Sequence, residues 1–488
     1  MDKDLASIQE ARECIQKAKA AGEVLAAMDQ KQLDRMVTAV AKTGGDHARE
    51  LAQLAVEETG FGVVEHKVIK NRFAADQIYQ AIKDQKVVGL LGKNTQTKTW
   101  DFGVPMGVVA GLVPSTNPTS TVIYKAMICL KAGNPIVFSP HPNALKCIIK
   151  AVNYVRDAVE RAGGPVDAVT VIKTPTLEAT RELMGHRDTK LILATGGPGM
   201  VKAAYSSGTP AIGVGAGNGP AYFHKSCELV KAVHRVMDSK TFDNGTICAS
   251  EQSVVVTRDF APQVQAEFER QGGYFLSKTQ RDVLAGFVLR SNGTMNPAIV
   301  GKSMKELCRL SGLTGVPDSA RVFLVPEEGV GKGYPFSNEK LGLILAYYVE
   351  ESEDKCLERC VELLRHEGAG HTFAIHALDE GVVETFAAAV PASRILVNTP
   401  ASLGGIGATT DLFPAMTLGC GAVGGSSTSN NIGPLDLVNI KRVAWGKREL
   451  ADLRGGEASC PSGNSNCQAE ISPKELERII RETLARLR

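Results

Sequence analysis

Apolar residues recur at helical spacing through residues 1–90, which are otherwise rich in Ala, Lys, Glu and Gln. A stripe of apolar positions that repeats every three or four residues is typical of an amphipathic helix that buries one face. The pattern therefore predicts helices at residues 5–20, 29–42, 44–57 and 66–83.

Short apolar runs alternate with amphipathic ones from about residue 100 onward. The run at 108–113 predicts a strand, because Pro114 ends it, and the next segment predicts a helix that stops at Gly133 and Asn134. A long amphipathic helix is expected at 144–163, and further strands at 135–139, 168–172, 190–196 and 210–214. This alternation is the pattern of a parallel, doubly wound sheet.

The alternation resumes after residue 230 and predicts a second α/β lobe. Its expected helices lie at 260–271 and 353–367, and its expected strands at 253–258, 322–326, 344–350, 371–377 and 394–399. A stretch rich in Gly, Ser, Thr and Asn follows at 404–434. The fold class that this organisation predicts is α/β, with two doubly wound lobes.

The last part of the chain has a different character. Residues 455–471 are small and polar, which predicts a flexible linker. Residues 472–488 predict a short helix that opens at Ser472 and gathers its apolar side chains on one face: Leu476, Ile479, Ile480, Leu484 and Leu487. Because so short a tethered helix is marginal in isolation, we expect it to dock on a partner.

The overall composition narrows the class of protein. At 488 residues the chain exceeds the roughly 250–300 residues at which a single core stops growing, so more than one lobe is expected. A net charge of +2 gives no basic excess for nucleic acid, and no apolar segment is long enough to span a membrane. The polar N-terminus is unlike a secretory signal, so a cytoplasmic protein is expected.

The 11 cysteines are scattered and odd in number, which argues against a disulfide framework. Cys356 and Cys360 lie in a helical pattern with no second ligand pair nearby, so we expect no metal site. Cys248 lies in Gly-Thr-Ile-Cys-Ala, just before an apolar strand, which places its thiol on a constrained loop. A thiolate in that place could attack a carbonyl, although spacing alone favours a buried structural cysteine.

Asn117 lies between Pro114 and Pro118 in the segment after the first strand. An amide fixed there can donate a hydrogen bond to a developing oxyanion, although a turn asparagine before proline is the commoner case. Two glycine clusters follow strands of the first lobe, at 195–199 and 213–220. Such turns suit a ligand at a helix N-terminus, and tight packing is the alternative interpretation.

Several segments taken together resemble the aldehyde dehydrogenase family, and within it the CoA-acylating branch. They occur in the family's order and cover about residues 100–440: GVPMGVVAGLVPSTNPTS, KAGNPIVFSPHPNA, ILATGGPGMVKAA, VGAGNGPAY, FDNGTICASEQ and EKLGLILAYY. The resemblance implies an NAD(P)-binding domain, a catalytic domain and a small oligomerisation element. The expected division is 1–230 for the cofactor domain, 231–420 for the catalytic domain, 421–454 for the return to the cofactor domain and oligomerisation element, and 455–471 and 472–488 for the linker and terminal helix.

The resemblance also implies roles for single residues. Cys248 matches the family's nucleophile, and Asn117 matches its oxyanion-hole asparagine, with the Cys248 backbone N–H as a second donor. Glu339 matches a glutamate associated with the nicotinamide ribose. The other implied cofactor contacts are Ser139, Pro140 and His141 beside the adenosine ribose, Thr195 and Gly196 near the pyrophosphate and nicotinamide, and Gly197 and Gly215. NAD is the expected cofactor, with NADP as the alternative, because no acidic residue clearly marks a ribose hydroxyl.

The segment GVGAGNGP at 213–220 departs from the hydrolytic members of the family. Those members carry a glutamate that activates water in the matching place, whereas this stretch holds no carboxylate. Without that general base, attack of water on a thioester is disfavoured, and the thiol of CoA is the expected acceptor. The expected reaction oxidises propionaldehyde or acetaldehyde with NAD and CoA to the acyl-CoA. A hydrolytic dehydrogenase and a noncatalytic scaffold of the same fold are the alternatives.

The linker and terminal helix resemble the encapsulation peptides that dock enzymes inside bacterial microcompartments. The resemblance implies that 472–488 binds a shell or another encapsulated enzyme, and that the protein resides in the cytoplasm inside such a compartment. An oligomerisation helix or a surface tail is the alternative. The family further implies a homodimer or homotetramer, and no nucleic acid or membrane partner is expected.

Overall fold

The computed structural model describes residues 2–290 and 293–453. The described residues form a large unit, up to Lys93 and from Trp100 to Arg442, and a small unit of Asn94–Thr99 with residues 443–453. The linker and helix predicted at 455–471 and 472–488 lie outside the described residues.

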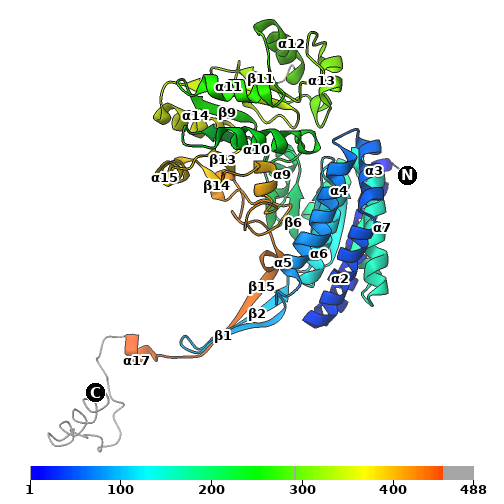
Figure 1. The fold of residues 1–488 in the computed structure, drawn as a ribbon. Helices are drawn as coiled ribbons and strands as arrows, with labels where there is room; N and C mark the ends of the chain where they lie inside the picture. Colours follow the sequence, from blue (N-terminus) through cyan, green and yellow to red (C-terminus); the bar gives the residue numbers. More distant parts are fainter. Residues whose placement is uncertain (1, 291–292, 454–488) are drawn as a thin grey trace, which may run out of the picture. The chain divides into compact units, whose positions relative to one another are not determined.

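The helices predicted at the N-terminus are present (Figure 1). They are α1 (Lys3–Ala26), α2 (Gln30–Asp46) and α3 (Ala48–Thr59). α2 begins with a capping box, in which Asp29 and Gln32 satisfy each other's backbone N–H groups. The fourth predicted helix is divided into α4 (Val64–Arg72), a π-helical turn (Phe73–Gln77) and α5 (Ile78–Ile82).

The first lobe is built on a five-stranded parallel sheet in the order β5-β4-β3-β6-β7. Its strands are β3 (Val108–Val113), β4 (Ile136–Pro140), β5 (Val169–Val171), β6 (Thr189–Thr195) and β7 (Ala211–Val214). Its helices are α6 (Pro118–Lys131), α7 (Leu145–Arg161), α8 (Leu177–Gly185) and α9 (Pro198–Tyr205). Every position of β3 and β4 is buried, which explains why both strands stand out in the sequence as apolar runs.

Two apolar cores cover the two faces of this sheet. Val109 of β3 and Phe138 of β4 pack on one face with side chains of α2, α6 and α7. Their chain neighbours Ala110 and Val137 point to the other face and pack with side chains of α1 and α8. The alternation along each strand thus buries both faces, and the doubly wound arrangement predicted from the sequence is confirmed.

The second lobe is built on a seven-stranded parallel sheet in the order β10-β11-β12-β9-β8-β13-β14. Its strands are β8 (Pro220–Phe223), β9 (Ser253–Thr257), β10 (Gly273–Phe275), β11 (Val322–Pro326), β12 (Ile344–Glu350), β13 (Gly370–His376) and β14 (Ala392–Val397). The helices of this part of the chain are α10 (Leu229–Thr241), α11 (Ala261–Arg270), α12 (Lys278–Val288), α13 (Met304–Ser311), α14 (Glu353–His366), α15 (Glu380–Ala389) and α16 (Ala401–Gly404).

The chain crosses from the first sheet to the second between Val214 and Pro220. β8 lies between β9 and β13, so the second sheet begins before the boundary at residue 230 that the sequence suggested. The crossing is made by the glycine-rich segment 213–220, which therefore joins the two sheets.

A third sheet has the order β1-β2-β15 and was not predicted. Its strands are β1 (Gly89–Asn94), β2 (Thr99–Pro105) and β15 (Val438–Ala444). Most of their residues are exposed or half-buried, so no apolar run marks them in the sequence. α17 (Leu450–Leu453) follows. Within the described chain, no helix is both long enough and apolar enough to cross a bilayer.

Three loops leave the first sheet along the same edge. β3 ends at Val113, β4 at Pro140 and β6 at Thr195, and these strands are neighbours with β3 in the middle. Ligands of parallel α/β sheets bind at the carboxyl ends of the strands, where such loops meet. Seven of the residues singled out in the sequence lie at or shortly after these strand ends: Asn117, Ser139, Pro140, His141, Thr195, Gly196 and Gly197.

Candidate active site

A cavity of about 500 Å³ draws its lining from segments of both lobes. Its lining includes every site residue that the sequence analysis named: Asn117, Ser139, Pro140, His141, Thr195, Gly196, Gly197, Gly215, Cys248 and Glu339. The structure therefore places a candidate nucleophile, a candidate oxyanion donor and the candidate cofactor residues around one space.

Cys248 reaches the cavity from a sharp turn between α10 and β9. Asp243, Asn244 and Gly245 have φ values of 50°, 52° and 75°, so the backbone is left-handed at consecutive positions. Asp, Asn and Gly are the residues that tolerate this conformation best, which explains the local sequence. Cys248 follows the turn and is half-buried in the cavity wall.

The Cys248 thiol is protonated at neutral pH in this structure. Burial raises its pKa to about 12, and the negative charge of Glu339 adds to the rise. The thiol must therefore lose its proton, or be met by positive charge, before it can act as a nucleophile.

Glu339 lies on the same cavity, in the segment that leads into β12. Its Oε1 accepts a hydrogen bond of 2.8 Å from the backbone N–H of Gly217. Burial, and then the charge of Glu367, raise the pKa of Glu339 to about 8. This carboxyl can consequently take up or release a proton near neutral pH.

Gly217 packs directly on the backbone of the candidate nucleophile. A Cβ built on Gly217 would lie 1.8 Å from the carbonyl oxygen of Cys248, so no side chain fits there. Val214, Gly215 and Ala216 of the same segment line the cavity. Segment 213–220 therefore forms the wall beside Cys248, and that segment contains no carboxylate.

Asn117 stands at the N-terminus of α6, with its side chain on the cavity. Its Oδ1 accepts a hydrogen bond of 2.6 Å from Lys70 Nζ, and its Nδ2 donates to Thr116 Oγ1 at 3.2 Å. Because a lysine can only donate, this contact fixes which side of the amide is oxygen and which is nitrogen.

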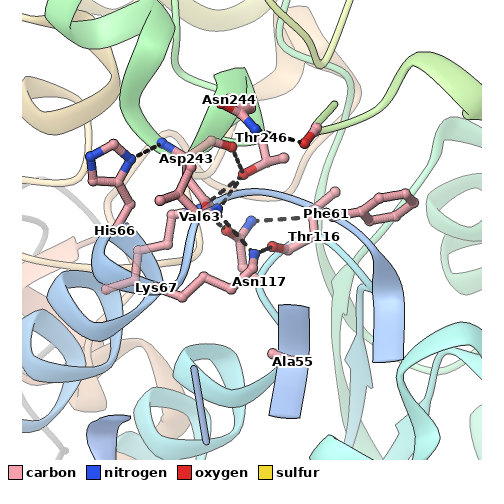
Figure 2. Close-up of polar contacts among 12 residues, drawn as sticks. Ala55, Phe61, Val63, His66, Lys67, Thr116, Asn117, Asp243, Asn244 and Thr246 are labelled. Atoms are coloured by element: carbon pink, nitrogen blue, oxygen red, sulfur yellow. Dashed lines mark hydrogen bonds and ion pairs between the residues drawn. The ribbon is translucent and has the colours of Figure 1, made fainter. Parts of the chain in front are cut away.

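A buried ionic cluster that the sequence did not predict supports Asn117 and the Cys248 turn. Asp243 Oδ2 accepts from Lys67 Nζ at 2.9 Å and also pairs with Lys70 Nζ. Figure 2 shows Lys67, Asp243, Thr246 and Asn117 gathered in this cluster. A signal was present, because Lys67 and Lys70 are three residues apart and therefore share a helix face, but surface lysines have the same spacing.

The candidate cofactor residues form a cradle at the ends of β4 and β6. Gly197 caps α9 without a side-chain hydrogen bond; Pro198 has no N–H and Met200 N–H donates to the Gly197 carbonyl, which leaves the N–H of Gly199 for a phosphate in this first turn. Thr195 Oγ1 is buried and has no hydrogen-bond partner among the described residues, as expected if a ligand completes it. A Cβ on Gly197 would meet nothing within 4 Å, so a ligand can approach this backbone. These features fit a dinucleotide.

Comparison with known proteins gives a consistent picture. The model of the aldehyde dehydrogenase family matches residues 3–272. A probable aldehyde dehydrogenase of Listeria monocytogenes is 56% identical, with a TM-score of 0.92, over 93% of this chain and 100% of that chain. An acetylating aldehyde dehydrogenase of Geobacillus thermoglucosidasius is 48% identical, with a TM-score of 0.90, over 92% of this chain and 99% of that chain.

Among curated proteins, the bifunctional aldehyde-alcohol dehydrogenase of Escherichia coli is 42% identical over 443 residues, which are 90% of this chain and 50% of that protein. The chain thus spans about half the length of the aldehyde-alcohol dehydrogenases it matches.

Two more distant structures bear on ligands and location. A propionaldehyde dehydrogenase from the fucose utilisation microcompartment of Clostridium phytofermentans is 30% identical, with a TM-score of 0.80, over 89% of this chain and 97% of that chain. A propionaldehyde dehydrogenase of Rhodopseudomonas palustris, solved with bound CoA and an acylated cysteine, is 26% identical, with a TM-score of 0.81, over 89% of this chain and 97% of that chain.

Proposed function

Because this chain belongs to the aldehyde dehydrogenase family, we propose that it is a CoA-acylating aldehyde dehydrogenase. It oxidises a short aliphatic aldehyde, propionaldehyde or acetaldehyde, with NAD and CoA to the acyl-CoA, through a thioester on Cys248. NADP is the alternative hydride acceptor.

The observation that carries this proposal is the wall beside Cys248. Segment 213–220 lies against the Cys248 carbonyl and brings no carboxylate to the thiol. That wall supplies no general base to activate water, which favours attack on a Cys248 thioester by another thiol over hydrolysis. The bound CoA and acylated cysteine of the Rhodopseudomonas palustris relative support the same acceptor.

The first step is addition of the Cys248 sulfur to the aldehyde carbon, which gives a thiohemiacetal. The thiol proton leaves to an acceptor in the cavity, and the ionised form of Glu339 is suited to take it, because a pKa raised to about 8 makes this carboxylate a stronger base than an ordinary one. Asn117 Nδ2 and the Cys248 backbone N–H donate to the oxyanion.

The second step removes a hydride from the thiohemiacetal carbon and leaves a thioester on Cys248. A bound nicotinamide dinucleotide supplies the hydride acceptor. Thr195, Gly196 and Gly197 would hold its pyrophosphate region at the α9 N-terminus, with Gly215 and Glu339 near the nicotinamide end. Ser139, Pro140 and His141 would contact the adenosine ribose.

The last step exchanges one thiol for another. The sulfur of CoA attacks the thioester carbonyl, the same donors stabilise the oxyanion, and Cys248 leaves and regains its proton. The balance is one aldehyde, one CoA and one NAD⁺ consumed for one acyl-CoA, one NADH and one proton.

The test is NADH formation from propionaldehyde and NAD, measured with and without CoA, with the product identified by mass. We expect turnover to require CoA and to give propionyl-CoA. Cys248→Ala should abolish turnover while cofactor binding, followed by fluorescence titration, stays near normal. CoA-independent release of propionate would contradict the proposal, because it would require a hydrolytic base.

For location, the proposal is that residues 472–488 are an encapsulation peptide and that the protein works inside a microcompartment. The sequence of the tail and the compartment named for the Clostridium phytofermentans relative support it. A reporter fused to residues 456–488 should enter shells, and the same reporter without them should stay outside. Truncation that abolishes catalysis would contradict the assignment and make the tail part of the fold.

A homodimer or homotetramer is proposed for the assembly. Ile440 and Val443 of β15 are 46% and 40% exposed, and exposed apolar side chains on a strand favour pairing between copies. Light scattering during size-exclusion chromatography tests this, and a monomer at micromolar concentration would contradict it.

A further inference from the structure

We propose that Lys70 is a positioning residue for the reaction: it holds the Asn117 amide so that the NH₂ group faces the reacting carbonyl oxygen, and Asp243 holds Lys70 in place. This inference rests on the proposed function, because it assigns a task only if an oxyanion forms on Cys248.

The contact between Lys70 and Asn117 decides the orientation of the amide. An asparagine amide can turn over about its last bond and exchange its oxygen for its nitrogen. Lys70 Nζ lies 2.6 Å from Asn117 Oδ1 and can only donate, so the turned amide would bring donor against donor. The nitrogen is thereby kept on the opposite side. One of its N–H groups reaches Thr116 Oγ1, and the second is left to donate to a substrate.

Lys70 is itself held by a complete set of acceptors. Besides Asn117, its Nζ donates to Thr246 Oγ1 at 3.0 Å and to Asp243 Oδ2. The side chains of Lys70 and Asp243 are 2% and 0% exposed. A buried ammonium without its partners is costly, so Lys70 cannot swing away from this arrangement cheaply.

Asp243 connects the donor to the nucleophile. Its Oδ1 accepts from the backbone N–H of Val63 at 2.8 Å, and its Oδ2 accepts from Lys67 at 2.9 Å. The same residue opens the left-handed turn that leads to Cys248. Asp243 therefore positions Lys70, which contacts Asn117, and also begins the turn that leads to Cys248.

The cluster also has an electrostatic consequence. Burial lowers the pKa of Lys70 to about 8, so this lysine is still mostly charged at neutral pH. Lys67 and Lys70 then carry two positive charges against the single negative charge of Asp243. The excess positive charge is buried and lies behind the amide that faces the oxyanion. Such fixed charge stabilises the negative charge that develops in the transition state, and it polarises the Asn117 N–H groups.

The experiment is a double-mutant cycle on kcat with Lys70→Met, Asn117→Ala and the double variant. Methionine matches the length of lysine but cannot donate. We expect Lys70→Met to lower kcat by about 100-fold in the wild-type background, the size of an oxyanion-donor loss. In the Asn117→Ala background the same change should lower kcat by less than about threefold, because Lys70 acts through Asn117.

Lys131→Met is the matched control. Lys131 lies in α6, is fully buried and pairs with Asp34 at 2.7 Å, but its Nζ donates to Asp34 and to the Lys83 carbonyl and not to Asn117. Lys131→Met should lower the free energy of unfolding, leave kcat near normal and show no coupling to Asn117→Ala. Binding of NAD, followed by fluorescence titration, needs no oxyanion, so its Kd should change by less than about threefold in Lys70→Met.

An equal loss of kcat from Lys70→Met in both backgrounds, or no loss at all, would overturn the inference. If Lys70→Met does not fold, Lys70→Gln decides, because its amide restores one donor toward Asn117 and should recover part of the activity. Failure of the wild-type chain to show CoA-dependent turnover would instead contradict the proposed function, so the two failures are distinguishable.

Discussion

At the scale of single residues, Gly217 and Cys248 are in direct contact across the cavity wall. The Cβ of any other residue at 217 would overlap the Cys248 carbonyl oxygen, at 1.8 Å. The fit between the two segments at this point depends on the absence of a side-chain atom at 217. The position of the nucleophile is therefore sensitive to the smallest possible substitution.

Gly217→Ala should lower kcat/KM by about 100-fold or more, because the cysteine loop must move to admit the methyl group. Gly286→Ala in α12 is the control, since a Cβ there meets nothing within 4 Å and alanine favours a helix. Steady-state kinetics of both variants checks this. Normal kinetics in Gly217→Ala would show that the loop yields without cost.

The pH dependence of Cys248 follows from its burial. With the pKa raised to about 12, the thiolate fraction of the cofactor-free protein should rise about tenfold for each pH unit between pH 7 and 10. Iodoacetamide alkylation at residue 248, measured by peptide mass with Cys248→Ala as background, should follow that slope. If the alkylation rate reached a plateau below pH 8, positive charge near the thiol would lower the pKa of Cys248 more than burial raises it.

The residues around the cavity were predictable and the ionic cluster was not. Asn117, Cys248 and Glu339 lie in segments with a recognisable order along the chain, so the resemblance placed them. Lys70 and Asp243 are 173 positions apart, and nothing in the local sequence of either indicates the other. In α4 a buried lysine has the same spacing as an exposed one, and only the tertiary fold separates the two.

At the scale of elements, the helix predicted at 66–83 is interrupted by the π-helical turn Phe73–Gln77. A π turn adds a residue to the helical repeat, so the faces before and after it do not continue each other. α4 thus turns Lys67, Lys70 and Asn71 inward, whereas α5 buries apolar residues. Periodicity indicated the helix but could not indicate the break.

A second contact between elements concerns α3 and α7. The Glu58 carboxylate accepts hydrogen bonds from the backbone N–H groups of Lys146 (2.7 Å) and Cys147 (2.8 Å), in the first turn of α7. Glu58 therefore satisfies backbone donors that have no acceptor within the helix. Its negative charge also interacts favourably with the positive end of the α7 dipole.

Glu58→Ala should lower the free energy of unfolding by about 1–2 kcal/mol, the usual cost of a lost helix cap, and leave kcat unchanged. Glu57→Ala, at an exposed neighbouring position, is the matched control and should be near neutral. Urea denaturation of both variants tests this. Equal stabilities would show that water replaces the carboxylate.

At the scale of the whole molecule, the alternation of strands and helices predicted two α/β lobes, but not how the second sheet is ordered. β8 pairs with β13, whose residues lie some 150 positions later in the chain. That pairing depends on long-range packing, which no local pattern encodes. The crossing between the sheets, between Val214 and Pro220, lies before residue 230, after which the alternation was predicted to resume.

Asp243 also joins parts of the fold, because it links α4 to the segment that enters the second sheet. Its lysine partners, opposing the effect of burial, lower its pKa from 3.8 to about 2. A carboxyl with a depressed folded-state pKa stabilises the fold fully above its unfolded pKa and loses that contribution as the pH falls toward the folded value.

Asp243→Asn should therefore be less stable than the wild type at pH 7, by about 3–5 kcal/mol for a broken buried pair. The difference should shrink as the pH falls from about 4 to about 2, because the wild-type carboxyl then protonates. Urea denaturation across this range measures it. A difference that stays constant with pH would mean that Asp243 acts by shape and not by charge.

The contact between Gly217 and Cys248 also limits which substitutions can arise at this position during evolution. Some glycine codons become glutamate codons by one base change, so a carboxylate in segment 213–220 is a short mutational step away. At 217 the added side chain would overlap the backbone of Cys248, so packing opposes that substitution. A Cβ at Gly215 meets nothing within 4 Å, so packing does not exclude a larger residue at that position.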